Sequence, residues 1–117
     1  MLAHRTMFKT QGVIMKEISA QDLVKIADIA TVIDVRETFE YVDGHFPGAI
    51  SMPLATVPAR FGELDKQTTY HVICEAGARS AKACDFLIEN GFDAINISDG
   101  TGLLRMISAQ LNFGENA

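Results

Sequence analysis

Short apolar runs alternate with amphipathic segments along most of this chain. The run TVIDV (31–35) is rich in β-branched residues and shows no polar alternation, which is typical of a strand covered on both faces. Four other runs have the length of strands and are separated by turn residues or helical patterns. Five strands are therefore expected, at VIMKEI (13–18), TVIDV (31–35), AISMP (49–53), YHVIC (70–74) and AINIS (94–98).

Helical patterns fill the intervals between these runs. Ser19 begins the tetrad Ser-Ala-Gln-Asp, a capping box that satisfies free amides at the start of a first helix. That helix carries Leu23, Ile26 and Ala27 on one face. The clearest helix runs over 79–90 and ends before Gly91. Further helices are expected at 37–43, 57–64 and 103–111, the last of them after a DGTG turn at 99–102.

This alternation predicts an α/β fold. Strands that alternate with helices form a mostly parallel sheet with helices on both faces, here five-stranded and in three layers. Residues 1–13 lack periodicity and are interpreted as a flexible N-terminal extension, whereas 14–117 form one domain. Ligands of such sheets bind beyond the carboxyl ends of the strands, and Cys74 stands at one such end.

Composition narrows the functional class. The 117 residues are 48% hydrophobic and 21% charged, as in ordinary soluble domains, and the net charge of -5 argues against nucleic acid or an anionic membrane as the main partner. No run approaches the ~18 apolar residues of a membrane span, and the first residues are a poor signal peptide. Cys74 and Cys84 fit neither a metal spacing nor a disulfide framework. We expect a cytoplasmic protein with reduced thiols and no metal.

The surroundings of Cys74 favour a reactive thiol over a buried spacer at the end of a strand, although both interpretations are open. Only the thiolate is strongly nucleophilic, and three features can stabilise it. The loop 75–78 contains Gly77, so its amides can form an anion-binding nest. The following helix contributes the positive end of its dipole, and Arg79 adds a full charge. Cys84 lies on the apolar face of the same helix and is expected in the core.

Two segments of the chain resemble a known protein family. The run Cys-Glu-Ala-Gly-Ala-Arg-Ser (74–80) resembles the active-site loop Cys-x-x-Gly-x-Arg-Ser of the rhodanese sulfurtransferases. The segment DVRETFEYVDGHFPGAISMPL (34–54) is similar to that family's Asp-Val-Arg, Glu-Tyr, Gly-His, Pro-Gly-Ala and Pro-Leu pattern. The likeness runs in register from about Ile14 to Gly100.

The resemblance implies a rhodanese-like fold and a sulfurtransferase that carries sulfane sulfur on Cys74 as a persulfide. The implied donor is a small molecule, and the implied acceptor is a thiol, cyanide or a protein. No cofactor is implied, and we expect a monomer or weak homodimer. The residues implied to bind the substrate are Glu75, Ala76, Gly77, Ala78, Arg79 and Ser80.

Other residues carry supporting roles in this interpretation. Arg79 either orients an anionic donor or holds the loop through a carboxylate. Asp34 and Arg36 are expected to brace the cysteine loop, because a charged group at the end of a strand needs a partner. Glu40 could pair with Arg36 at helical spacing. His45 is expected to be a structural hydrogen-bonding group of the GHFPG turn.

The chain also departs from the family pattern. It has no tryptophan near its last helix, where Leu103 or Leu104 could replace the lost packing. The loop carries the acidic Glu75 and a single basic residue. A dianion such as thiosulfate should therefore be attracted less strongly than by a loop with several cations.

A cysteine in such a loop can also serve three other functions. Cysteine phosphatases and arsenate reductases of related fold place five residues between cysteine and arginine, whereas four separate Cys74 from Arg79 here. The shorter loop should crowd a tetrahedral oxyanion but hold one sulfur atom. A non-enzymatic sulfur carrier or a redox-sensing interaction module stays open. For sensing, a buried Cys84 would be a poor resolving thiol.

Overall fold

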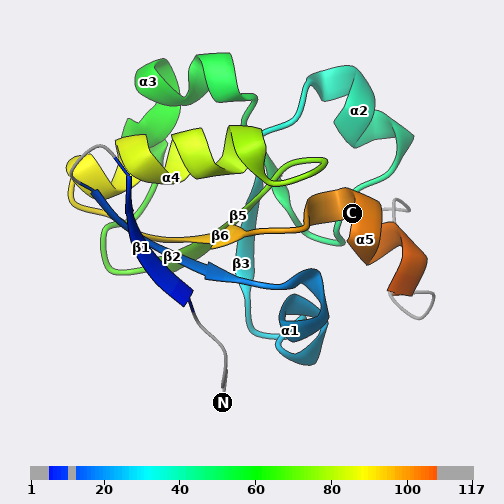
Figure 1. The fold of residues 1–117 in the computed structure, drawn as a ribbon. Coiled ribbons are helices and arrows are strands. Elements are labelled where there is room, and N and C mark those ends of the chain that lie inside the picture. The colour runs from blue at the N-terminus through cyan, green and yellow to red at the C-terminus, as the bar shows by residue number, and fades with distance from the viewer. Residues whose placement is uncertain (1–5, 11–12, 108–117) are drawn as a thin grey trace.

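The structure is a computed structural model that describes residues 6–10 and 13–107. Figure 1 shows a twisted sheet between two groups of helices. The strands are β1 (Thr6–Thr10), β2 (Val13–Ile18), β3 (Thr31–Asp34), β4 (Ile50–Ser51), β5 (Thr69–Ile73) and β6 (Asp93–Ile97). The helices are α1 (Ala20–Lys25), α2 (Thr38–Asp43), α3 (Val57–Arg60), α4 (Ala78–Glu89) and α5 (Gly100–Ile107), with 3-10 turns η1 (Leu54–Thr56) and η2 (Phe61–Glu63).

The sheet confirms the predicted parallel arrangement. Its strand order within the described residues is β1-β2-β6-β5-β3-β4. The five strands β2 to β6 are parallel to one another, and β1 is added antiparallel at the β2 edge. Figure 1 shows α3 and α4 on one face of the sheet and α1 on the other, while α5 packs against α1. The α/β class and the three layers are therefore as expected.

Two apolar cores lie on the two faces of the sheet. Alternate residues of a strand point to opposite faces, so β5 contributes Val72 and the adjoining Cys74 to one core and Ile73 to the other. The core that contains Cys74 also contains Cys84 and Leu87 from α4. The strand period therefore turns the side chain of Cys74 toward the face that α4 covers.

The expectation for the N-terminus was wrong in part. Residues 1–13 were interpreted as a flexible extension, but Thr6–Thr10 form β1, which pairs antiparallel with β2 from Thr6 opposite Glu17 to Thr10 opposite Val13. Pairing along the edge of a sheet uses backbone amides and carbonyls and requires no hydrophobic period. Residues 6–10 can therefore pair as a strand although they show no hydrophobic period. Residues 1–5 and 11–12 lie outside the described residues.

The closing helix also begins earlier than predicted. It starts at Gly100, inside the expected DGTG turn, because the amides of Thr101 and Gly102 find acceptors in the loop after β5. Positions 108–111 of the expected helix lie outside the described residues. The expected helix at 57–64 is divided into α3 and η2, and the third strand is reduced to Ile50–Ser51. No helix in the described part of the chain is long and apolar enough to cross a bilayer.

Candidate active site

Cys74 directly follows β5, and three residues (75–77) separate it from Ala78, where α4 begins. Its side chain is 1% exposed, so the sulfur lies inside the protein although it stands at a strand end. The Gly77 amide donates to Sγ at 3.1 Å, and the Ser80 hydroxyl lies 3.3 Å from it. The thiol is therefore buried, as a spacer at the end of a strand would be, and it is also surrounded by the hydrogen-bonding groups that a reactive thiol needs.

The surroundings of the two cysteines shift the pKa values of their thiols in opposite directions. Burial raises the pKa of Cys74, but hydrogen bonds from the Ser80 hydroxyl and from the amides of Ser80, Gly77 and Ala76 outweigh it, so the pKa lies below its ordinary value. Cys84 is fully buried, and burial raises the pKa of its thiol far above the ordinary value. Of the two thiols, only Cys74 has surroundings that favour a thiolate.

Helix α5 fixes the direction of the cysteine loop from behind. The Thr101 amide donates to the Cys74 carbonyl at 2.8 Å, and the Gly102 amide donates to the Glu75 carbonyl at 3.0 Å. In a trans peptide the N–H points opposite to the carbonyl. The amides of Glu75 and Ala76 therefore point away from α5, on the side where a cup for an anion can form.

Two glycines make this arrangement possible. Gly77 has φ +104°, and a Cβ there would lie 2.2 Å from the Ser98 carbonyl oxygen. Gly100 has φ +64°, and a Cβ there would lie 2.6 Å from the carbonyl oxygens of Cys74 and Glu75. Both the left-handed backbone and the lack of space require glycine at these positions.

Arg36 connects the end of β3 with the cysteine loop. Its Nε and Nη2 donate to the buried Asp34 carboxylate at 2.9–3.2 Å, and Nη2 also donates to the Gly44 carbonyl at 2.6 Å. Nη1 reaches the Glu75 carboxylate at 3.4 Å. Since the guanidinium is 2% exposed, these partners replace the water that a buried charge loses.

Arg79 binds a carboxylate of α2. Its Nη1 and Nη2 donate to the two Glu40 carboxylate oxygens at 2.7 and 3.1 Å. The hydrogen bond from Arg79 is the main reason that the pKa of Glu40 falls to about 2, against the opposing effect of burial. The expected Glu40–Arg36 pair was therefore wrong. Helical spacing does not apply to Arg36, because α2 begins after its N-cap residue Glu37.

The charge on Glu75 is opposed by two guanidinium groups. Arg105 of α5 donates to the Glu75 carboxylate at 3.0 and 3.4 Å, and Arg36 donates to it at 3.4 Å. The hydrogen bond from Arg105 is the largest cause that lowers the pKa of Glu75. Sequence reasoning missed Arg105, since nothing local marks it as a partner of a residue 30 positions earlier. A cleft of about 340 Å³ next to this pair is lined by Arg36, Phe39, Glu40, Asp43, Glu75 and Arg105.

His45 is held within its own turn. Its Nδ1 lies 2.6 Å from the Tyr41 carbonyl oxygen, and its ring stacks on the Tyr41 ring with 3.6 Å between centroids. The Tyr41 hydroxyl in turn donates to the Ala49 carbonyl at 2.6 Å. These contacts place His45 in the segment that joins α2 to β4.

A polar group beneath the loop was also missed. Asn96 of β6 accepts a hydrogen bond from the Ser80 hydroxyl at 2.5 Å, and its Nδ2 lies 3.3 Å from the Gly77 carbonyl and 3.4 Å from the Glu17 carboxylate. Sequence analysis predicted AINIS (94–98) as the fifth strand and gave Asn96 no role. An asparagine inside such a strand was the available signal, because a buried amide needs partners.

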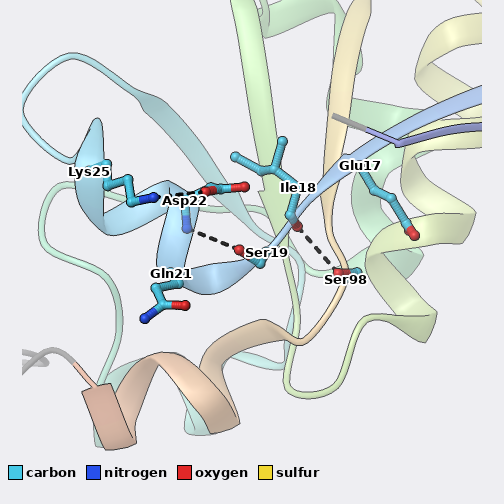
Figure 2. Close-up of a pocket in the computed structure, with 7 residues that line it drawn as sticks. All are labelled: Glu17, Ile18, Ser19, Gln21, Asp22, Lys25 and Ser98. Atoms are coloured by element: carbon cyan, nitrogen blue, oxygen red, sulfur yellow. Dashed lines mark hydrogen bonds and ion pairs between the residues drawn. The ribbon is translucent and has the colours of Figure 1, made fainter. Parts of the chain in front are cut away.

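A second cavity, of about 400 Å³, lies where β2 and β6 end beside α1 (Figure 2). The Ser98 hydroxyl donates to the Ile18 carbonyl there, and Ser19 caps α1 by accepting from the Asp22 amide. The lining residues are Glu17, Ile18, Ser19, Gln21, Asp22, Lys25 and Ser98, and they do not include Cys74. Among residues 6–10 and 13–107, no group of three or more His, Cys, Asp or Glu side chains could hold a metal ion.

Residues 17–101 match the family model described as the rhodanese-like domain. The chain belongs to this family. The match runs from the end of β2 to the start of α5, and so includes Cys74, its loop and the strand ends around it. The recognition made from the two sequence motifs is confirmed.

Known proteins agree with this assignment. The chain is 35% identical over 89 residues to the putative sulfurtransferase YtwF of Bacillus subtilis. The aligned segment covers 74% of this chain and 86% of YtwF. It is 37% identical over 70 residues to the putative sulfur carrier protein YrkF of the same organism, covering 59% of this chain and 38% of that protein. A crystal structure of a rhodanese-related protein from Thermoplasma volcanium superposes with a TM-score of 0.74 and 32% identity, over 77% of this chain and 90% of that one.

In this rhodanese-like domain, which has no tryptophan, the two leucines of α5 differ in their burial. Leu104 of α5 is fully buried in the core that α1 and α5 share, and Leu103 packs against the same core while partly exposed. Of the two candidates, Leu104 supplies the buried packing. Because α5 also anchors the cysteine loop, this packing supports the floor of the site.

Replacement of Gly100 by alanine should destabilise the domain. Alanine at this position would have a left-handed backbone, and its Cβ would press against the carbonyl oxygens of Cys74 and Glu75. Together these two costs should lower the free energy of unfolding by about 2–4 kcal/mol. Urea unfolding measures it. Gly48→Ala is a control, because Gly48 has a left-handed backbone (φ +81°) but free space around an added Cβ, and it should lower the free energy of unfolding by about 1–2 kcal/mol. Gly62→Ala is a second control, because Gly62 has neither a left-handed backbone nor a close neighbour. A loss for Gly100→Ala no larger than that of Gly48→Ala would contradict the close contact.

The Glu40–Arg79 pair should make stability depend on pH. Since the pKa of Glu40 in the fold is about 2 and its ordinary value is 4.5, its contribution is present above pH 4.5 and is lost as the pH falls toward 2. Glu40→Gln keeps the shape and removes the charge, so it should lose about 0.5–1 kcal/mol at neutral pH for this partly exposed pair. The difference from the unaltered protein should shrink as the pH falls through 2 and vanish only below it, because half of Glu40 is still ionised at its folded pKa.

Denaturant unfolding across this pH range measures the effect. Glu63→Gln provides a matched control, because Glu63 pairs with Arg60 on the surface of the protein and its charge is more fully hydrated. Its loss should be smaller than that of Glu40→Gln. Equal losses for the two variants, or a Glu40→Gln difference that persists at the lowest pH, would contradict the role of the Glu40 charge.

Proposed function

We propose that this chain is a sulfurtransferase that carries sulfane sulfur as a persulfide on Cys74. The observation that supports it most is the hydrogen bonding around Sγ, where the Gly77 amide and the Ser80 hydroxyl lie within 3.3 Å of a buried thiol. Such groups stabilise a thiolate, which is the nucleophile that sulfur transfer needs. Membership of the rhodanese-like family and the name of the relative YtwF support the same class of reaction.

In the first step the Cys74 thiolate attacks the outer sulfur of the donor. With thiosulfate, a bond forms between Sγ and the sulfane sulfur, the S–S bond of the donor breaks, and sulfite leaves with the electron pair. The product is a Cys74 persulfide whose outer sulfur carries the negative charge. The loop amides that point away from α5, together with the N-terminus of α4, would stabilise this charge.

In the second step an acceptor attacks that outer sulfur. Cyanide leaves as thiocyanate, or a thiolate acceptor leaves as a persulfide, and the electron pair of the broken S–S bond returns to Cys74. The thiolate is thereby restored without any redox cofactor. The two half-reactions form a ping-pong sequence with a covalent intermediate.

Arg79 supports sulfur transfer over phosphate chemistry. Both of its terminal nitrogens donate to Glu40, so the guanidinium is committed to a carboxylate. A phosphatase needs its arginine free to bind the oxygens of the phosphate. With four residues between Cys74 and Arg79, the loop is also shorter than the five-residue loops of cysteine phosphatases.

The site suits a small donor and a small or extended acceptor. Cys74 is 1% exposed, and the neighbouring cleft of about 340 Å³ lies between α2 and α5. A reactant must therefore be small or narrow to reach Cys74. A sulfane donor, a thiol, cyanide or an extended protein segment that bears a cysteine meets this requirement. The cytoplasm is the proposed location, because both cysteines are free thiols. The proposed state is a monomer or weak homodimer.

A sulfur carrier is the second candidate. It would hold the same Cys74 persulfide and hand it to a protein partner without turnover on small molecules, and the name of the relative YrkF favours it. A redox sensor that uses a Cys74–Cys84 disulfide is less well supported. Cys84 is fully buried in α4, and its raised pKa leaves it a poor nucleophile.

The central test is thiocyanate formation from thiosulfate and cyanide. Cys74→Ser should reduce this activity to the uncatalysed background, because serine forms no persulfide. Cys84→Ala should keep most of the activity, since Cys84 lies in the core behind the loop. Undiminished turnover by Cys74→Ser would refute the mechanism, and aryl phosphate hydrolysis at a comparable rate would support a phosphatase instead. A stable added sulfur on Cys74 in intact mass spectra, without turnover, would favour the carrier.

Glu75 should determine the affinity for an anionic donor. Its carboxylate stands beside the cysteine loop and opposes Arg36 and Arg105, so Glu75→Gln leaves both cations without this counter-charge. An exposed charge contributes about 1 kcal/mol at such distances, which predicts a KM for thiosulfate up to about fivefold lower with little change in kcat.

Steady-state kinetics at low and high salt test this effect, which salt should weaken. Glu89→Gln removes the same charge from the opposite end of α4 and should leave the KM for thiosulfate unchanged. A KM that rises in Glu75→Gln would show that Glu75 instead positions the two arginines for the donor.

A further inference from the structure

The Ser80 hydroxyl lies among three hydrogen-bond acceptors. The Asn96 Oδ1 is 2.5 Å away, the Gly77 carbonyl is 3.2 Å away, and the Cys74 Sγ is 3.3 Å away. A serine hydroxyl has one proton and can donate it to one acceptor at a time. Ser80 is fully buried, so no water replaces a lost partner.

The orientation of the Asn96 amide is fixed by its other contacts. Its Nδ2 lies 3.3 Å from the Gly77 carbonyl and 3.4 Å from the Glu17 carboxylate, and both of these groups are acceptors. A turned amide would place Oδ1 against two oxygens. The Asn96 oxygen therefore faces Ser80 and accepts the hydrogen bond from its hydroxyl. The Asn96 residue is 3% exposed.

We propose that Asn96 is a positioning residue that holds the Ser80 proton away from Cys74 and so limits how readily the thiol ionises. In the thiol state, Cys74 donates to the Ser80 oxygen, and Ser80 donates to Asn96. In the thiolate state the Ser80 hydroxyl turns to donate to sulfur, and its bond to Asn96 is lost. The inference rests on the proposed function, in which Cys74 must ionise before it attacks a donor.

Several ionisable groups face this cluster and belong to any account of its pH dependence. Glu17 faces it from β2, and Arg79 and Cys84 belong to α4. Glu75 lies in the loop itself, held by Arg36 and Arg105. Replacement of Asn96 by a neutral residue leaves all of these charges in place, but it also removes the Nδ2 contacts to Glu17 and to the Gly77 carbonyl. The effect of the hydrogen bond to Ser80 is therefore isolated by comparison with a Ser80→Ala background.

The experiment measures the pH dependence of Cys74 alkylation by iodoacetamide in the full reduced chain, with Cys84→Ala as the background. Asn96→Leu removes the competing acceptor. The alkylation rate below the midpoint should rise about two- to tenfold, and the midpoint should move to lower pH, because a thiolate accepts the released proton in preference to the neutral Gly77 carbonyl. Asn96→Asp should move the midpoint to higher pH, since a carboxylate holds the Ser80 proton more firmly.

A second background separates the hydroxyl from the fold. With Ser80→Ala present, Asn96→Leu should no longer move the midpoint, because the proton in question is absent. A purely structural role of Asn96 predicts the opposite sign, since a loosened loop would lose the Gly77 amide from sulfur. Asn96→Ala serves if the leucine variant does not fold, and Ile95→Val is a matched control in the same buried strand.

The inference is overturned if the folded Asn96→Leu or Asn96→Ala variant shows a raised or unchanged midpoint, or if the shift persists in the Ser80→Ala background. Circular dichroism and thermal melting establish that each variant is folded. Alkylation needs no sulfur donor, so the result is independent of turnover. Absent thiocyanate formation together with the expected midpoint shifts would reject the sulfurtransferase and retain the role of Asn96.

Discussion

The geometry of the site depends on two hydrogen bonds that hold the cysteine loop from behind. The Thr101 and Gly102 amides of α5 bind the carbonyls of Cys74 and Glu75, and this turns the following amides toward the opposite side. Without these bonds the loop carbonyls would be free to rotate toward the sulfur and repel a negative charge. Gly100 allows α5 to start close enough to make them, and buried Leu104 holds α5 against the sheet.

Around this loop the charged side chains neutralise one another. Arg79 is paired with Glu40, Arg36 with Asp34 and Glu75, and Arg105 with Glu75. The cations that stand near Cys74 are thus occupied by carboxylates. Stabilisation of a negative sulfur therefore comes mainly from backbone amides and one hydroxyl. Directed amides in a small cup suit a single sulfur atom better than a tetrahedral oxyanion, which would need free cations as well.

Burial of Cys74 has two opposite consequences. It disfavours the thiolate, and it also strengthens every hydrogen bond that the sulfur accepts, because water does not compete. The balance depends on where the few available protons point. Ser80 has a single proton between Asn96 and Cys74, which is why we propose that a side chain in a neighbouring strand affects the ionisation of the cysteine.

The local features of this protein were determined by the sequence itself. Strand β5, helix α4, the turn at Gly77 and the place of Cys74 between them follow from periods and turn residues within 20 positions, and the two motifs identify the family. Tertiary structure decided what local patterns do not encode. Glu40 meets Arg79 across 39 positions, Arg105 meets Glu75 across 30, and β1 finds the edge of β2. These outcomes depend on which charges and strand edges the folded chain brings together, because a buried or exposed polar group takes the partner that packing places within reach.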